Sequence, residues 1–270
     1  MTLNTQGLGP EERRPARSAL FPWYDSHWLT QYVRARAIIE KVRPQALGAF
    51  EDALRVFRTR QDFREKVLDR PFDDKTLEEI RRMTRALRPM DLKLHEAQSF
   101  GRFVVHDHPF FTELQQCAVP LVSEAVGEPV EASYNFLGLY GSLGVCPPHL
   151  DDPFAKWTLD LCIDQSAPWP IHFSEVCPWP DGQGQTWPQV GWEEQVKRSR
   201  QFSKYTLRPG QAVVFSGSSQ WHFRDAMPSA GGRQFCDLLF FHFIPRGTAE
   251  LVRSKAWARW FGIPELGELA

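Results

Sequence analysis

A histidine and a carboxylate separated by one residue stand in the segment "CPPHLDDPF", residues 146–154. In an extended chain, residues i and i+2 face the same side, so His149 and Asp151 are expected to point into one space. An imidazole and a carboxylate suit Fe(II), and a set of two histidines and one carboxylate leaves coordination positions open for other ligands. The competing acid, Asp152, is expected to face away and to serve as a loop or capping carboxylate.

A second histidine further along the chain would complete such a set. His222 stands in "SSQWHFRDAMPSAGGRQF", after a predicted strand over 211–216, and Arg233 follows at the entry to the last predicted strand. A guanidinium binds a carboxylate through two parallel hydrogen bonds. The two histidines and Asp151 therefore indicate a metal site, and Arg233 follows them with a group that can bind a carboxylate.

This ordered set resembles that of the 2-oxoglutarate- and Fe(II)-dependent dioxygenases, in a bacterial branch that acts on small molecules. The resemblance covers about 130–245 and lies in "YGSLGVCPPHLD", "WTLDLCIDQ", "PGQAVVFSGSSQWHFRD" and "LLFFHFIP". It implies a double-stranded β-helix, or jelly roll, in which Arg233 holds the distal carboxylate of 2-oxoglutarate. Tyr140 or Thr158 would add a hydroxyl donor to the cosubstrate. The implied iron ligands are His149, Asp151 and His222.

Other side chains near the motifs are candidates for contact with a substrate. Arg224 shares a face with His222 in an extended chain and competes with Arg233 for the cosubstrate. It could instead bind an anionic group of the substrate or pair with Asp160 or Asp225. The remaining substrate candidates are His172, for which a buried structural role is the alternative, and Trp221.

Three further histidines are expected to have structural roles. His106 and His108 form a second i, i+2 pair, but they precede a helical stretch and lack a carboxylate in the right order. His242 alternates with Arg233 along the last predicted strand, so we expect it to face out of the cavity.

The elements that must position these residues change in character along the chain. Polar residues 1–20 predict a flexible lead-in. Apolar residues at helical spacing predict helices between 28 and 87 and over 108–127, with a possible break at Pro120. Asp74 is the predicted N-cap of one of these helices.

After Gly127, short aromatic-rich segments predict roughly eight antiparallel strands. The expected fold class is therefore α+β, with one oxygenase domain over 21–270. Its helical part (about 21–128) packs on a jelly-roll core (about 129–246), and a C-terminal helix follows over about 247–264. The long segment 177–199 interrupts the strands and is a candidate lid, because it carries several tryptophans.

Composition limits the kinds of partner. Lys and Arg number 32 and Asp and Glu 33 among the 270 residues, so a formal net charge of −1 offers no broad field to nucleic acid or an anionic membrane. No apolar run approaches the ~18 residues of a spanning helix, and the N-terminus has no signal-like apolar region. The five cysteines form no CxxC pair. We expect a cytoplasmic monomer or homodimer that binds a small molecule.

The resemblance implies an oxygenase that uses Fe(II), 2-oxoglutarate and O2 and releases succinate and CO2. Its expected substrate is an unactivated C–H bond of a small metabolite, such as an amino acid or a natural-product intermediate. A hydroxylase of protein or peptide side chains is the alternative within the same fold. A non-catalytic, cupin-like ligand-binding protein is the alternative of a different class.

Overall fold

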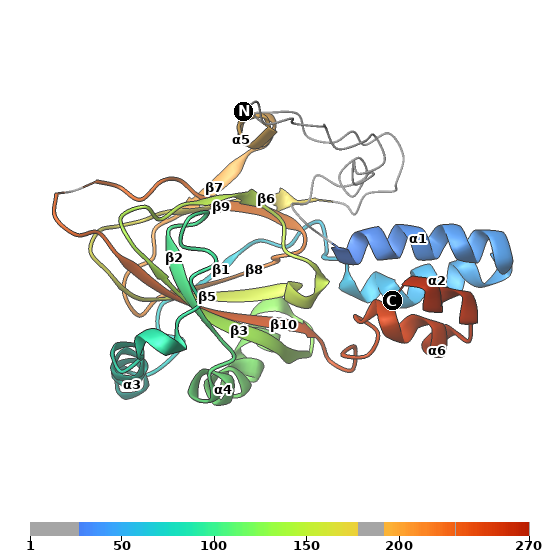
Figure 1. Cartoon of the computed structure of the whole chain (residues 1–270), viewed down its shortest axis with the longest axis horizontal. Helices are drawn as coiled ribbons and strands as arrows, with labels where there is room; N and C mark the ends of the chain where they lie inside the picture. Colours follow the sequence, from blue (N-terminus) through green and yellow to red (C-terminus); the bar gives the residue numbers. More distant parts are fainter. Residues whose placement is uncertain (1–26, 178–191, 230, 270) are drawn as a thin grey trace, which may run out of the picture.

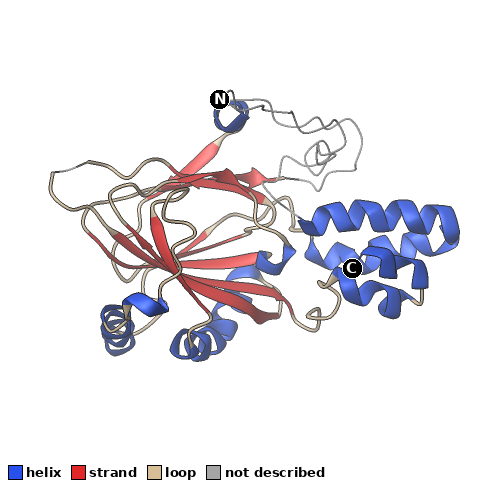
Figure 2. Cartoon of the chain, in the orientation of Figure 1, coloured by secondary structure: helices blue, strands red, loops and turns tan. Residues whose placement is uncertain are grey.

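The computed structural model describes residues 27–177, 192–229 and 231–269. Within these ranges, ten strands form two antiparallel sheets that face each other. Helices lie beneath the larger sheet and at one end, and a further helix over 192–199 lies on the side of the smaller sheet (Figures 1 and 2). None of the helices in these ranges is both long and apolar enough to cross a bilayer.

The larger sheet has the strand order β1-β8-β5-β10-β3-β2. Its strands are β1 Lys66–Leu68, β2 Arg102–His106, β3 Val130–Tyr140, β5 Trp157–Gln165, β8 Ala212–Phe215 and β10 Cys236–Pro245. The smaller sheet has the order β4-β9-β6-β7, with β4 Cys146–His149, β9 Gln220–Arg224, β6 Ile171–Val176 and β7 Phe202–Tyr205. From β3 onward the chain passes back and forth between the sheets, which is the jelly-roll arrangement, so the predicted fold class is confirmed.

Alternation along β10 shows how the sequence builds the core between and beneath the sheets. Leu239, Phe241 and Phe243 point to the outer face, where they pack with apolar residues of α4 Pro109–Val126. Leu238 and Phe240, which alternate with these residues, belong to the inner cluster instead. Every residue of this strand except one is buried, because both of its faces are covered.

The helices divide into two groups that the sequence did not distinguish. α3 Asp74–Arg85 and α4 lie beneath the larger sheet (Figure 1). α1 His27–Val42 and α2 Leu47–Leu54 instead pack with α6 Trp257–Phe261 at the end of the barrel. Aromatic side chains pack at the centre of this helical group. The ring centroids of Trp28 and Trp257 lie 5.4 Å apart there, edge to face. The remaining helix is α5 Trp192–Ser199, and short 3-10 helices are η2 Pro44–Ala46, η3 Arg55–Phe57, η4 Pro89–Asp91, η5 Pro153–Ala155, η6 Ser254–Ala256 and η7 Pro264–Leu269.

Three local predictions need correction. The N-cap of α3 is Asp73, whose carboxylate accepts a hydrogen bond from the Thr76 N–H, and not Asp74. α4 continues through Pro120, because Pro120 and the carbonyl-bearing Gln116 lie on its exposed face, where water can satisfy the freed carbonyl. The predicted closing helix is only α6, flanked by η6 and η7.

Candidate metal centre and cavity

Two histidines meet across neighbouring strands of the smaller sheet. His149 ends β4 and His222 lies in β9, and their Cα atoms are direct partners in the antiparallel register. Their ring centroids are 4.1 Å apart. Asp151 joins them, and ligand atoms of the three side chains all lie within 4.8 Å of one another. The three residues that the sequence motif selects are therefore neighbours in space.

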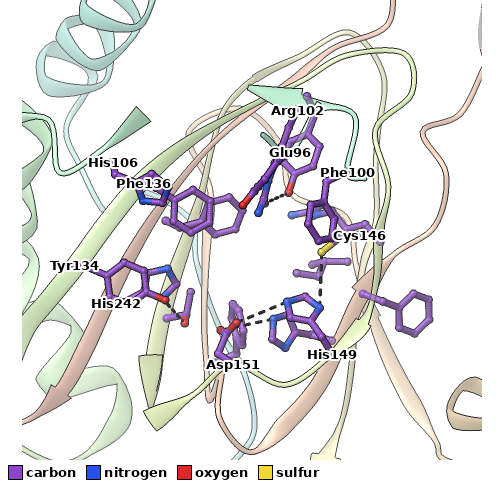
Figure 3. A pocket seen from close by; sticks show the side chains of 18 residues that line it. Glu96, Phe100, Arg102, His106, Tyr134, Phe136, Cys146, His149, Asp151 and His242 are labelled. Atoms are coloured by element: carbon purple, nitrogen blue, oxygen red, sulfur yellow. Dashed lines mark hydrogen bonds and ion pairs between the residues drawn. The ribbon is translucent and has the colours of Figure 1, made fainter. Parts of the chain in front are cut away.

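Backbone carbonyls fix how both imidazoles point. Nδ1 of His149 lies 2.8 Å from the Pro147 carbonyl oxygen, and Nδ1 of His222 lies 2.9 Å from that of Gln220. Because a carbonyl only accepts, each Nδ1 must carry the proton that it donates. Each Nε2 then faces Asp151, at 3.6 Å from Oδ1 for His149 and 3.7 Å from Oδ2 for His222 (Figure 3). Such outer hydrogen bonds orient histidines that bind metals.

The two histidines differ in their affinity for a proton. Burial, together with the nearby His149, holds the pKa of His222 well below its usual value, so this imidazole is neutral. Burial also disfavours charge on His149, but Cys146 and Asp151 outweigh it and raise the pKa of His149 to about 9. A cation that binds Nε2 of His149 must therefore displace a proton, and its affinity falls as the pH decreases.

Asp151 owes its position to a loop contact, not to strand alternation. It lies beyond the end of β4, and its N–H donates to the Gly217 carbonyl over 2.8 Å. A Cβ atom on Gly217 would stand 2.3 Å from Oδ2 of Asp151, so only glycine leaves room for this carboxylate. Asp152 accepts a hydrogen bond from the Phe154 N–H at 2.9 Å and caps η5, which confirms its predicted capping role. Burial raises the pKa of Asp152 to about 6.

These residues stand at one end of a cavity of about 290 Å³ inside the barrel (Figure 3). Its polar lining is Glu96, Arg102, His106, Tyr134, Tyr140, Cys146, His149, Asp151, Thr158, His222, Arg224 and His242. Its apolar lining is Phe100, Phe136, Ile171, Phe215, Phe223 and Phe240. A concave space with aromatic walls and convergent polar groups is typical of a small-molecule site.

Arg224 contributes one of the two guanidinium groups in this wall. It follows His222 by two residues in β9 and is buried, as is its partner Asp160, whose carboxylate lies 2.7 Å from Nη2. Nη1 donates to the Trp169 carbonyl oxygen. Burial raises the pKa of Asp160 and Arg224 opposes that rise. Of the alternatives for Arg224, the ion pair with Asp160 is therefore present, whereas Asp225 pairs with Lys197.

The second guanidinium, that of Arg102, was missed by sequence reasoning. It comes from β2, where Nε donates to Glu96 and Nη1 donates to the Tyr140 hydroxyl. Arg102 and His106 both line the cavity from this strand. The signal in the sequence is the short run "RFVVH", because an extended chain places its first and last residues, Arg102 and His106, on one face.

Arg233 does not occupy its predicted position. It is exposed and lies outside the cavity. β10 begins only at Cys236, after a turn in which Gly231 and Gly232 have φ values of +78° and +77°. Strand alternation therefore does not extend back to Arg233, which removes the ground for its predicted orientation toward a cosubstrate.

The predicted orientation of His242, out of the cavity, is also wrong. Because Arg233 is not in the strand, the alternation counted from it was wrong, and His242 lines the cavity. Its Nδ1 lies 3.0 Å from the Thr158 hydroxyl, and its ring stacks on Tyr134 at a centroid distance of 4.2 Å. Burial lowers the pKa of His242 to about 4, so the ring is neutral.

Two predicted substrate contacts lie outside the cavity lining. Trp221 points away from His222 and is buried in the cluster that includes Trp28 and Trp257. His172 stacks on Phe223 at 4.4 Å and has Nε2 3.6 Å from Oδ2 of Asp225, so it takes the structural alternative. Most of the predicted lid segment, 178–191, lies outside the described residues.

Comparison with known proteins supports this architecture. No protein-family model matches the sequence, and no curated protein is significantly similar to it. Among solved structures, SnoN, a non-haem α-ketoglutarate-dependent epimerase from nogalamycin biosynthesis, is 16% identical, with a TM-score of 0.51 over 76% of this chain and 89% of that chain. The fold is thus one found among non-haem 2-oxoglutarate-dependent enzymes, and the resemblance inferred from the motifs is confirmed at this level.

Two further solved structures are more distant in shape. HygX from Streptomyces hygroscopicus, with nickel and 2-oxoglutarate bound, is 12% identical over 68% of this chain and 83% of that chain, with a TM-score of 0.47. A prolyl-4-hydroxylase from Pseudomonas putida is 12% identical over 68% of this chain and 93% of that chain, with a TM-score of 0.44.

Proposed function

We propose that the protein is an Fe(II)- and 2-oxoglutarate-dependent oxygenase that oxidises a C–H bond of a small molecule. The observation that carries the proposal is the convergence of His149, Asp151 and His222, whose ligand atoms lie within 4.8 Å of one another on a cavity wall. Two imidazole nitrogens and one carboxylate suit Fe(II) and leave coordination positions for a cosubstrate and O2. When bound, iron and 2-oxoglutarate supply oxidation of the C–H bond by O2, with release of succinate and CO2.

The residues present fit the metal. Each histidine has its Nδ1 engaged by a carbonyl, so Nε2 is the remaining nitrogen, and both Nε2 atoms approach the same carboxylate. Neutral imidazole is the form that binds a metal, and the lowered pKa of His222 keeps it in that form. His149, Asp151 and His222 therefore hold the iron, while the Pro147 and Gln220 carbonyls orient the two rings.

Arg224, in place of Arg233, receives the distal carboxylate of 2-oxoglutarate. It lies on the same face of β9 as His222 and two residues further on, a separation of roughly 7 Å along a strand. A five-carbon dicarboxylate that reaches the metal with its keto-acid end can extend over such a distance. Asp160 and the Trp169 carbonyl fix the guanidinium in the wall.

The two predicted hydroxyl donors take different places. Tyr140 lines the cavity and its hydroxyl accepts from Nη1 of Arg102, so the hydroxyl hydrogen is left to serve as the second donor to the distal carboxylate. Thr158 belongs at the metal end, because its hydroxyl and Oδ2 of Asp151 both approach Gly217. There it positions His242 through the 3.0 Å contact.

The size of the cavity favours a small molecule over a protein segment as substrate. About 290 Å³ lies at the lower end of the usual range for ligand sites, which is roughly 300–1,000 Å³. The space must hold the cosubstrate as well, and aromatic rings form much of its wall.

Production of succinate tests the proposal. In the presence of Fe(II), 2-oxoglutarate and O2, we expect the wild type to form succinate. Addition of a pool of small metabolites should increase the rate of succinate formation. His149→Ala should form none above the protein-free background. Equal succinate formation by the wild type and by His149→Ala would contradict the proposed function.

A further inference from the structure

The structure points to Arg102 as the anchor for an anionic group of the substrate, which makes the substrate a small acid. This inference rests on the proposed function for the reaction, but the anchor is built from residues outside the metal triad. Arg102 and Glu96 lie at the other end of the cavity view from Asp151 and His149 (Figure 3). An acid held there would place the rest of its carbon skeleton toward the metal.

Arg102 is held in one position by its surroundings. Nε donates to Glu96, Nη1 donates to the Tyr140 hydroxyl, and only 11% of the side chain is exposed. Aromatic rings surround the guanidinium, whose central carbon lies 5.0 Å from the centroids of Phe100 and Phe136. Fixing a long side chain before binding reduces the entropy that a ligand must offset.

The guanidinium of Arg102 has N–H groups that remain available to a ligand. Arginine carries five N–H groups in a planar fork, and Glu96 and Tyr140 occupy one each. Across the described ranges, Arg102 makes no other hydrogen bond, so three N–H groups at Nη1 and Nη2 have no protein acceptor there. A carboxylate or another oxyanion is the ligand that such a fork binds best.

Glu96 is a poorer anchor for a cation. One of its carboxylate oxygens accepts from Arg102, and the other lies 3.5 Å from Nε2 of His95. The carboxylate is thus already paired with a cation, whereas three N–H groups of Arg102 have no acceptor among the described residues. This asymmetry favours a negatively charged substrate over a positively charged one.

Arg102 and Arg224 reach the cavity from different sheets. Arg224 comes from β9 of the smaller sheet, and its charge is matched by the buried Asp160 at 2.7 Å. Arg102 comes from β2, at the edge of the larger sheet. We assign Arg224 to the cosubstrate, because it shares a face of β9 with His222, and Arg102 to the substrate, because three of its N–H groups have no acceptor among the described residues.

Aromatic side chains beside Arg102 indicate that the carbon skeleton of the acid is apolar. Phe136 and Phe240 stack with centroids 4.6 Å apart and line the cavity together with Phe100. These surfaces suit an aryl or aliphatic skeleton and contribute apolar burial. The substrate class is therefore a small carboxylic acid, or a related oxyanion, with an apolar body.

Binding of simple probes tests the anchor without turnover. Protein loaded anaerobically with Fe(II) and 2-oxoglutarate is titrated by calorimetry with phenylacetate, with its neutral analogue phenylacetamide and with the cation phenethylamine. We expect phenylacetate to bind the wild type about tenfold or more tightly than phenylacetamide, because charge-assisted hydrogen bonds exceed neutral ones. Arg102→Gln should lose this preference, Arg102→Lys should keep part of it, and the exposed Arg233→Gln should keep all of it.

Several results would overturn the inference. They are an equal affinity of the wild type for acid and amide, an unchanged preference in Arg102→Gln, and the tightest binding by phenethylamine. Loss of 2-oxoglutarate binding in Arg102→Gln, seen as loss of its visible band with Fe(II), would assign Arg102 to the cosubstrate instead. If the wild type shows no such band, the proposed function fails, and the calorimetric preference for the acid still decides the role of Arg102.

Discussion

His149 and His222 face each other across the β4–β9 pair with ring centroids 4.1 Å apart. Each ring is tied to a carbonyl through Nδ1, so the two Nε2 atoms are held at one place beside Asp151. A cation shared by the three side chains explains why these buried and partly buried polar groups converge there, because a divalent metal satisfies all of them at once.

Asp151 and Asp152 provide a matched pair of variants for the metal centre. Asp151→Asn removes an anionic ligand, and we expect the affinity for Fe(II) to fall by about 100-fold or more, beyond the usual cost of losing an outer-shell partner. Asp152→Asn retains an oxygen that can accept from the Phe154 N–H, so it should bind Fe(II) like the wild type. Anaerobic metal titration checks both; equal losses in the two variants would refute the assignment.

Gly217 makes the space that Asp151 occupies. A Cβ at this position would lie 2.3 Å from Oδ2 of Asp151 and 2.6 Å from the Ala155 carbonyl, so Gly217→Ala must displace the carboxylate. We expect a loss of Fe(II) affinity of about 10- to 100-fold. The control is Gly48→Ala, where no atom lies within 4 Å and helix α2 should gain up to about 1 kcal/mol. Unchanged metal affinity in Gly217→Ala would show that the carboxylate is not held as described.

Variants of Arg224 and Arg233 show which of the two arginines binds the distal carboxylate of 2-oxoglutarate. Arg233→Gln should leave the affinity for 2-oxoglutarate unchanged, because the side chain is exposed and outside the cavity. Arg224→Met alone leaves Asp160 buried without its partner, which costs about 3–5 kcal/mol of stability. The double variant Arg224→Met/Asp160→Asn removes that penalty, so it should fold stably yet bind 2-oxoglutarate at least about tenfold more weakly. Isothermal titration calorimetry gives the affinities; a loss confined to Arg233→Gln would reverse the assignment.

The buried imidazole of His242 makes stability depend on pH, because its pKa is about 4 in the folded protein against an ordinary value of 6.5. Below pH 6.5 the unfolded chain takes up a proton that the folded chain does not, so the free energy of unfolding decreases as the pH falls. The decrease reaches about 3 kcal/mol near pH 4. His242→Gln has no such group. Urea unfolding of both metal-free proteins at pH 7 and pH 4 should show a larger loss for the wild type; parallel losses would contradict the lowered pKa.

The sequence predicted the fold well where alternation and turns were regular. Alternation and aromatic residues predict strands over 131–141, 156–164 and 233–244, and the observed strands are Val130–Tyr140, Trp157–Gln165 and Cys236–Pro245. His149, Asp151 and His222 were found because their types, order and spacing are dictated by the metal's chemistry. Asp151 was selected through strand alternation, although a loop contact with Gly217 in fact positions it.

Errors arose where orientation depended on a strand end or a distant partner. Arg233 was assigned a direction as though β10 already included it, and His242 was then assigned the opposite one. Arg102 was missed because β2 is a short edge strand whose role depends on pairing with β3, far along the chain. Neither the start of a strand nor a long-range pairing can be read from local periodicity.

The most direct test of the central claim is anaerobic titration of the protein with Fe(II) and 2-oxoglutarate, followed by visible absorption. A weak charge-transfer band should develop in the wild type as the cosubstrate binds the metal, and it should not develop in His149→Ala. A band that is absent from the wild type, or one that persists in His149→Ala, would contradict a metal centre formed by His149, Asp151 and His222.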